Sequence, residues 1–228
     1  MAGPSVYERF PSGVLGLDEV LGGGIPSGSF FLIAGPSGTG KTVLASQIAY
    51  LTAVRGGSVV YVSFDEGLRL VDIMSGFGWD VEPLVKEGRL IVLDPTSMRR
   101  GSISDYVNFM LMKVREVKAE LLVVDSLTTL IITLPELSEA RIMLDFLRKA
   151  KPGHVTLLAT ANMSMGVRRI GVGVEEVVAD GLILLSRRLV KGEFRIFLSI
   201  LKVRGSAHSR RQHELMITPS GVRVVTVA

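Results

Sequence analysis

The chain has 228 residues, which is enough for one well-cored α/β domain and few for two, so we expect residues 1–228 to form a single domain. Hydrophobic residues make up 47% and charged residues 21%, a balance typical of globular rather than disordered chains. The absence of cysteine excludes disulfides, thiolate metal sites and a cysteine nucleophile. The longest apolar run, at 121–134, is too short for a membrane span, and the start of the chain shows no secretory signal. These features predict a cytoplasmic protein without a membrane segment.

The formal net charge is +4, but the charge is unevenly distributed. Residues 186–213 contain a single acid, Glu193, and eight basic residues. These are Arg187, Arg188, Lys191, Arg195, Lys202, Arg204, Arg210 and Arg211. A local basic block indicates binding to phosphate, nucleic acid or an acidic partner surface, and the alternative is an ordinary solvated face. Amide side chains are rare, and together with the missing cysteines they favour a thermophilic source.

Apolar runs of strand length recur along the chain. They lie at 29–34, 58–64, 89–93, 121–125, 155–161, 181–186 and 194–203. Helical patterns separate them at 41–54, 103–118 and 136–150. The early runs are continuous in Val, Ile and Leu, as in strands covered on both faces, so the alternation predicts a doubly wound, mainly parallel α/β sheet. After residue 181 the pattern becomes strand–turn–strand, with a turn at 218–221, which predicts an antiparallel C-terminal extension.

Residues 35–42 read GPSGTGKT and match the phosphate-loop pattern G-x-x-x-x-G-K-[ST] in full, between a predicted strand and a predicted helix. In such a loop, backbone N–H groups surround the β-phosphate at the positive end of the following helix. The lysine reaches the β- and γ-phosphates, and the hydroxyl of the last residue ligates Mg²⁺. The residues expected to bind the nucleotide here are Ser37, Gly38, Thr39, Gly40, Lys41, Thr42 and Val43.

A carboxylate that supports Mg²⁺ is expected across the sheet from this loop. The run LLVVD at 121–125 ends a buried strand on Asp125. We therefore predict a metal site formed by Thr42 and Asp125, with ATP and Mg²⁺ as cofactors. The alternative is that Asp125 only caps the helix that follows.

A pair of acids, Asp65 and Glu66, ends the strand that follows the phosphate-loop helix. On a doubly wound sheet this end of the strand faces the ligand crevice. A carboxylate there can accept a proton from the water that attacks the γ-phosphate, so both acids are candidate catalytic residues beside Lys41. The alternative is a cap for a helix that begins near Leu68. The chain has no N-K-x-D tetrapeptide, which argues against a GTPase.

Lys202 and Arg204 lie two positions apart in the segment LKVRGSAH, at 201–208. On a strand they would share one face, about 6.6 Å apart, and could bind one anionic group together. The alternative is a charged edge strand without a specific ligand.

The order and spacing of these motifs resemble the KaiC family within the RecA/RadA superfamily, over nearly the whole chain. The matching segments are PSGVLGLDEVLGGGIPSGSFFLIAGPSGTGKT, VSFDE, FGWD at 77–80, VVDS, GVEEVVADGLILL and LKVRGSAH. The resemblance implies a RecA-like P-loop NTPase fold and a Mg²⁺-dependent ATPase.

The resemblance also implies that Lys202 and Arg204 act from the neighbouring protomer on the γ-phosphate. It places His208 near the nucleotide from the same side and gives Thr218 a further contact. An active site completed in this way requires a homo-oligomer, either a filament or a ring, and a hexameric ring is expected.

Two departures from the family matter. The acidic pair is usually Glu-Glu, and here its first member is Asp65, so Glu66 is expected to carry more of the role of the base. The stretch RRIGVGVEEV contains neither Ser nor Thr where the clock protein of the family is autophosphorylated, so autokinase activity is not expected.

The sequence is compatible with three functions. The first is an oligomeric KaiC-like ATPase in signalling or regulation, with a protein partner that the sequence does not identify. The second is a DNA-binding recombination accessory resembling RadB, which would use the basic block and the loop at 162–173, but this loop lacks aromatic residues for base stacking. The third is a nucleotide-sensing ring with negligible turnover. Nucleic acid is therefore a possible but not a favoured partner.

Overall fold

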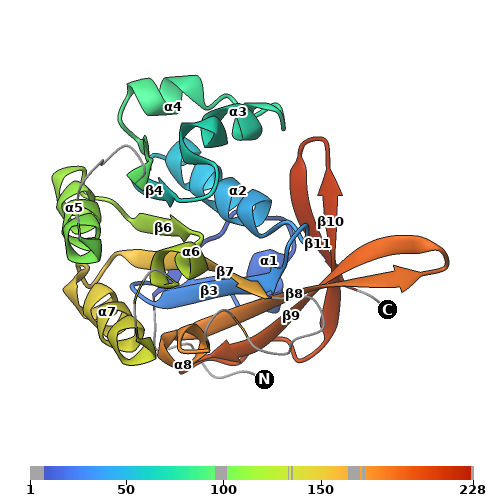
Figure 1. Ribbon diagram of the computed structural model, residues 1–228. Coiled ribbons are helices and arrows are strands. Elements are labelled where there is room, and N and C mark those ends of the chain that lie inside the picture. Colours follow the sequence, from blue (N-terminus) through green and yellow to red (C-terminus); the bar gives the residue numbers. More distant parts are fainter. Residues whose placement is uncertain are drawn as a thin grey trace.

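A nine-stranded sheet forms the centre of the molecule in the computed structural model (Figure 1), which describes residues 8–95, 102–132, 134, 136–163, 170 and 173–226. The strands lie in the order β11-β10-β9-β8-β3-β7-β6-β4-β5. They are β3 (Phe30–Pro36), β4 (Val59–Ser63), β5 (Leu90–Leu93), β6 (Leu121–Asp125), β7 (Thr156–Met163), β8 (Gly181–Val190), β9 (Glu193–Val203), β10 (Gln212–Thr218) and β11 (Gly221–Thr226). β1 (Arg9–Phe10) and β2 (Ile25–Pro26) form a separate antiparallel pair.

Helices connect the parallel strands. They are α1 (Leu17–Val20), α2 (Lys41–Val54), α3 (Leu70–Ser75), α4 (Glu82–Lys86), α5 (Ile103–Glu116), α6 (Leu127–Ile131), α7 (Leu137–Ala150) and α8 (Glu175–Val178), with a 3₁₀ turn, η1, at Gly67–Arg69. The strands from β8 to β5 in the sheet order pair in parallel. β9, β10 and β11 add antiparallel pairs beyond β8. The predicted parallel sheet with an antiparallel C-terminal extension is therefore confirmed.

Alternate side chains of the central strands supply two hydrophobic cores, because successive residues of a strand point to opposite faces. Phe31 and Ile33 of β3 pack with α2 on one face, where the cluster extends to β9, β10 and β11. Phe30 and Leu32 pack on the other face with α5, α6 and α7. Figure 1 shows α2 above the sheet and α7 below it. Burial on both faces explains the continuous apolar runs in the sequence.

The predicted elements match the observed ones closely, although several short elements, among them α1, α4 and the β1–β2 pair, were not predicted. α2 and β6 occupy the predicted ranges 41–54 and 121–125. β8 runs to Val190 instead of residue 186, because it continues as one arm of a long hairpin with β9 that projects from the molecule (Figure 1). The short helix α8, before β8, was not predicted, since four residues are too few to show helical periodicity.

Trp79 belongs to the hydrophobic core. The residue is 8% exposed, and its ring stacks on Tyr50, with centroids 5.3 Å apart, and on Phe77 at 5.2 Å. The indole N–H donates to the carbonyl oxygen of Ser220 at 3.0 Å. Trp79 therefore joins α2 to the turn between β10 and β11.

Candidate nucleotide-binding site

The phosphate loop connects the end of β3 to the start of α2. Gly40, the N-cap of α2, has φ +83°, and Gly38 has φ +76°, a region that side-chain-bearing residues rarely adopt. A Cβ atom on Gly40 would stand 2.9 Å from Cδ1 of Ile217 in β10. Glycine is therefore required at Gly40 by the backbone and by the close approach of β10, and the loop is left as a concave backbone surface at a helix N-terminus.

Lys41 is buried inside this loop, with 7% of its surface exposed. Its ammonium donates to the carbonyl oxygen of Pro36 at 3.0 Å, and Thr39 Oγ1 donates to the same oxygen at 2.8 Å. Burial lowers the pKa of Lys41, and the negative charges of Asp125 and Asp65 partly offset this shift. A buried cation held by a single carbonyl oxygen is well placed to exchange it for phosphate oxygens.

Asp125, at the end of β6, is buried beside the lysine. Its Oδ2 accepts the hydroxyl proton of Tyr61 at 2.9 Å, and its Oδ1 accepts a hydrogen bond from Thr160. Burial, followed by the charge of Asp125, raises the pKa of the Tyr61 hydroxyl, which therefore stays a donor. The helix that follows is capped instead by Ser126, whose Oγ accepts the N–H of Thr129 at 3.2 Å. The alternative role of Asp125 as a helix cap is therefore wrong.

The residues at this edge fit a magnesium ion that arrives with a nucleotide. Each Asp125 oxygen accepts one hydrogen bond in this structure, and a carboxylate oxygen has a further lone pair for a metal-bound water. Thr42 lies in the first turn of α2, one residue after Lys41. Among the described residues no group of three or more His, Cys, Asp or Glu side chains could hold a metal. Mg²⁺ takes few protein ligands and completes its shell with water and phosphate oxygens, so the Thr42 hydroxyl and the Asp125 carboxylate are suitable ligands for it.

The acidic pair lies just beyond β4, which ends at Ser63, one residue before the predicted end. Asp65 Oδ1 accepts the hydroxyl proton of Thr129 at 2.8 Å, and its charge acts on Lys41. Glu66 is half-buried at the N-cap position of η1, where its side chain makes no capping hydrogen bond. Asp65 is therefore held near the phosphate loop. The Glu66 side chain does not cap η1, so the capping alternative does not apply to Glu66.

Three side chains of this site were missed by sequence reasoning. Tyr61 and Thr160 hold Asp125, and Thr129 holds Asp65. The signal for Tyr61 was present, because a tyrosine in a fully buried strand needs a partner for its hydroxyl. Thr129 and Thr160 are ordinary residues of a helix and a strand, and only the folded chain brings them to the acids.

Lys202 and Arg204 lie at the opposite edge of the sheet from the phosphate loop. Lys202 is level with Leu182 of β8, which is level with Leu32 of β3. Pro36 lies four positions beyond Leu32 in β3, a distance of about 13 Å along the strand. The two cations therefore do not belong to the phosphate site of their own subunit.

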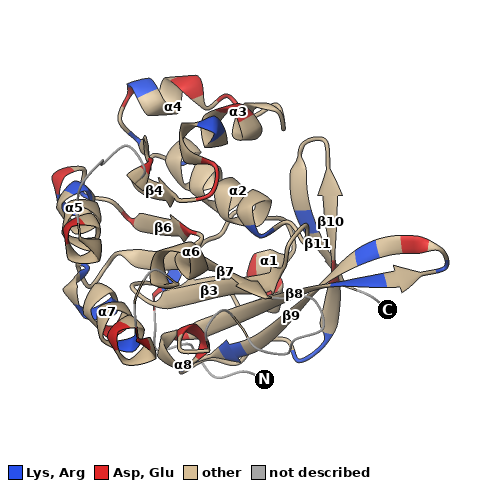
Figure 2. Cartoon of the chain, in the orientation of Figure 1, with Lys and Arg blue, Asp and Glu red and all other residues tan. Residues whose placement is uncertain are grey.

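Backbone carbonyls around α8 hold both cations. Lys202 Nζ donates to the carbonyl oxygen of Glu176 at 3.1 Å, and Arg204 donates to that of Val177 at 3.0 Å and to Asp180 Oδ1 at 3.1 Å. Arg204 lies one residue beyond the end of β9 at Val203, so only Lys202 is on the strand. Burial, then the neighbouring charge of Arg204, lowers the pKa of Lys202. Figure 2 shows this basic end of β9 beside the acidic α8.

The other two nucleotide candidates lie apart from each other. Thr218 closes the turn between β10 and β11 by donating to the carbonyl oxygen of Gly221 at 2.9 Å. It follows Ile217, which approaches Gly40, so it lies on the side of its own phosphate loop. His208 is half-buried on the segment after Arg204, and its Nδ1 is buried without a hydrogen-bond partner among the described residues.

The loop at 162–173, which carried the DNA-binding alternative, falls largely outside the described residues, at 164–169 and 171–172. Within the described part of the chain, no helix is both long enough and apolar enough to cross a membrane.

Known proteins resemble this chain along most of its length. The family model described as "ATPase: KaiC" matches residues 10–227. A UPF0273 protein of Pyrococcus horikoshii is 32% identical over 232 residues, covering 95% of this chain and 93% of that protein. A UPF0273 protein of Thermotoga maritima is 33% identical over 234 residues, covering 95% and 96%.

Two further comparisons concern proteins named for KaiC. The circadian clock oscillator protein KaiC of a Picosynechococcus strain is 31% identical over 222 residues, which cover 92% of this chain and 43% of the clock protein. The crystal structure of a KaiC-like protein from Pyrococcus horikoshii superposes with a TM-score of 0.85 at 31% identity, covering 96% of this chain and 99% of that one. The RecA-type fold expected from the motifs is thus confirmed, and the chain belongs to the KaiC family of ATPases.

Proposed function

We propose that this protein binds ATP with Mg²⁺ at residues 35–42 and hydrolyses it. The observation that carries the proposal is the buried ammonium of Lys41. It lies in a complete phosphate loop and interacts electrostatically with Asp125 and Asp65. In a site of this kind the lysine leaves Pro36 and binds the β- and γ-phosphates, and backbone N–H groups from Gly38 onward hold the β-phosphate.

The acids at the same edge have separate roles in this proposal. Thr42 and Asp125 would hold Mg²⁺, which neutralises charge on the β- and γ-phosphate oxygens when it is bound. Asp65 or Glu66 accepts the proton of the attacking water. Thr129 orients the Asp65 carboxylate through the bond to Oδ1. Asp65 is the better candidate for the base, because its carboxylate is held in place, whereas the family pattern had favoured Glu66.

The proposed active site is completed by a second copy of the chain. Lys202 and Arg204 are separated from their own phosphate loop by the length of the parallel strands, while their edge of the sheet is partly exposed. A head-to-tail contact would bring this edge to the neighbour's phosphate loop, where the cations stabilise charge on the γ-phosphate and His208 approaches the nucleotide. Repetition of the contact produces a ring, for which we propose six copies. Thr218 contacts the nucleotide of its own subunit.

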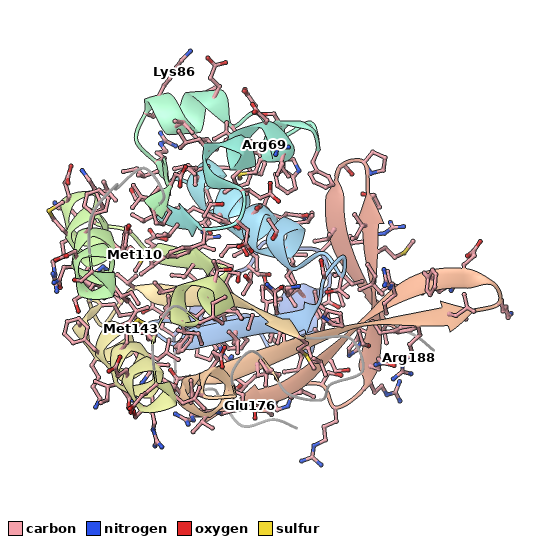
Figure 3. All side chains as sticks on the ribbon, viewed as in Figure 1. Arg69, Lys86, Met110, Met143, Glu176 and Arg188 are labelled. Atoms are coloured by element: carbon pink, nitrogen blue, oxygen red, sulfur yellow. The ribbon has the colours of Figure 1, made fainter. Side chains whose placement is uncertain are left out.

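The test is nucleotide binding and ATP turnover with and without Mg²⁺, in the wild-type protein and in Lys41→Ala. Turnover should be abolished and ATP binding sharply weakened in this variant. Lys86→Ala is the matched control, because Lys86 is an exposed lysine of α4 that pairs with Glu82, far from the loop (Figure 3). Unchanged turnover in Lys41→Ala would refute the proposed function.

A role in signalling or regulation through a protein partner is proposed from membership of the KaiC family. Adding single-stranded DNA to the turnover assay tests the alternative, since stimulation by DNA would indicate a recombination accessory instead. Light scattering on the same samples measures the number of subunits.

A further inference from the structure

β8 passes alongside the phosphate loop of its own subunit. Its pairing with β3 ends at Ala34 and Leu184. A Cβ atom on Gly35 would stand 2.7 Å from the carbonyl oxygen of Leu185, so the two chains stay in contact past this point. Two residues further, Nη1 of Arg187 lies 3.7 Å from the position of a Cβ on Gly38. The guanidinium of Arg187 is therefore at the tip of the phosphate loop.

An aromatic side chain of the hairpin supports this guanidinium. Arg187 pairs with Ile196 across the β8–β9 hairpin, and Phe194 lies two residues along on the same face. The Arg187 carbon Cζ is 5.1 Å from the centroid of the Phe194 ring. Phe194 is 70% exposed, so burial in the core does not account for an aromatic residue here. A cation–π contact with Arg187 gives it a role.

The donor groups of Arg187 remain available. Arg195 of the same hairpin pairs with Glu193 and Glu214, and Arg204 pairs with Asp180. Within the described residues Arg187 is exposed and has neither a carboxylate partner nor a side-chain hydrogen bond. A guanidinium has five N–H donors in a planar fork that suits phosphate oxygens.

We propose that Arg187 binds the β- and γ-phosphates of the nucleotide in its own subunit, with Phe194 as the positioning residue. The inference rests on the proposed ATP site and adds to it a cation supplied in cis. A phosphate loop surrounds the β-phosphate with its N–H groups, so a cation at the loop tip is adjacent to the phosphate end of the ligand and remote from the base. Lys202 and Arg204 would approach the same phosphates from the neighbouring subunit.

The first experiment measures the equilibrium affinity for ATP, ADP and AMP in Arg187→Ala. Loss of charged hydrogen bonds to the phosphates should weaken ATP binding about tenfold or more, weaken ADP binding by a smaller factor, and leave AMP binding unchanged. Arg188→Ala is the matched control. Arg188 is the next residue of β8, points to the other face of the hairpin and has its own aromatic contact, with Cζ 5.5 Å from the Phe197 ring centroid (Figure 3). Its ATP affinity should stay within about twofold of wild type.

Two further variants separate the charge from the fold of the hairpin. Arg187→Lys keeps a cation and should restore part of the ATP affinity. Phe194→Leu keeps an apolar side chain without the ring and should weaken ATP binding less than Arg187→Ala. The inference is refuted if Arg187→Ala binds ATP as tightly as Arg188→Ala, or if AMP binding falls by the same factor as ATP binding. Either result, in a protein whose ATP binding still requires Lys41, leaves the proposed function intact, whereas a wild-type protein that does not bind ATP refutes both.

Discussion

The two edges of the parallel sheet present their cations in different ways. The carboxyl ends of the parallel strands form one edge, here called the carboxyl edge. There Lys41 is 7% exposed and lies near the carboxylates of Asp125 and Asp65. The amino ends of the same strands form the opposite edge, here called the amino edge. There the Arg204 side chain is 50% exposed, and both Arg204 and Lys202 donate to backbone carbonyls of α8.

This difference indicates what each edge can do. A buried cation among acids of its own subunit acts only on a ligand that enters that subunit. Cations on the exposed edge, about 13 Å away along the strands, are accessible to another copy of the chain. The register of β3, β8 and β9, rather than any single contact, separates the two sets. The comparison therefore predicts that each edge is inactive without the other, and that they need not come from one chain.

The largest expected effect comes from separating the two edges into different subunits. Lys41→Ala removes the phosphate-site lysine, and the double variant Lys202→Ala/Arg204→Ala removes the exposed cations. Lys41→Ala alone should have no turnover, and the double variant alone should lose roughly 10³-fold or more, the usual effect of an arginine finger. After subunit exchange, a mixture should recover part of the activity, because some interfaces join an intact loop to intact cations. ATPase assays on equilibrated mixtures measure the recovery.

The outcome of mixing decides between two arrangements. A mixture that stays inactive, although mass spectrometry shows mixed oligomers, would mean that the cations act within their own subunit. Full activity of the double variant alone would mean that β9 ends in an ordinary charged edge.

The next largest effect concerns the acids at the carboxyl edge. Asp65→Asn should reduce turnover by about 10²-fold while ATP still binds, because the proposed base is lost. Glu66→Gln should also reduce turnover, but less, since Thr129 holds the Asp65 carboxylate. Thr129→Val is the variant that tests orientation, as it removes the hydrogen bond to Asp65 without changing charge. Single-turnover hydrolysis with measured ATP affinity distinguishes these cases, and a larger loss in Glu66→Gln would assign the base to Glu66.

A smaller effect is expected at the amino edge from Asp180→Asn. This change removes the ion pair with Arg204, while an amide oxygen can still accept the N–H of Phe30 that Asp180 Oδ2 binds at 2.9 Å. Turnover should fall several-fold, because Arg204 loses one of its two anchors. The free energy of unfolding should change by less than about 1 kcal/mol, as for other partly exposed ion pairs. Thermal unfolding and turnover are the measurements, and unchanged turnover would show that Asp180 does not position Arg204.

Much of this arrangement could be predicted from the sequence, and the reason is local. The phosphate loop combines a fixed pattern with a strand before it and a helix after it, so Lys41 and Thr42 needed no tertiary information. The apolar run before Asp125 placed that acid at a strand end. The side chains that hold the acids, such as Tyr61 and Thr160, come from separate strands, and their meeting depends on the strand order.

The basic block at 186–213 shows what could not be predicted from the sequence. Its eight cations look alike in the sequence, but the structure gives them different surroundings. Arg187 lies at the phosphate loop, Arg195 is paired with acids, and Arg204 lies at the opposite edge. The hairpin of β8 and β9 causes this, because Arg187 and Arg195 lie near each other across the hairpin while Arg204, nine residues after Arg195, follows the far end of β9.

The smallest expected effect is a decrease in the free energy of unfolding at acidic pH. It arises at His213 and Ser209, in the part of the chain that follows Arg204. His213 in β10 is buried, and its Nε2 shares a hydrogen bond of 2.7 Å with Ser209 Oγ. Ser209 in turn donates its N–H to the carbonyl oxygen of Val20 at 2.8 Å, which fixes the segment after Arg204. Burial, and then the charge of Arg211, lowers the pKa of His213 below its ordinary value.

The sign of the effect follows from this direction. Between the folded and unfolded pKa values of His213 the unfolded chain binds more protons, so the free energy of unfolding falls as the pH drops below about 6.5, and the loss is complete below the folded pKa. His213→Gln should remove this part of the pH dependence, whereas His154→Gln, at an exposed histidine, should retain it. Urea unfolding from about pH 8 to pH 5 measures the difference. Equal acid sensitivity of wild type and His213→Gln would show that the burial of His213 does not cause this pH dependence.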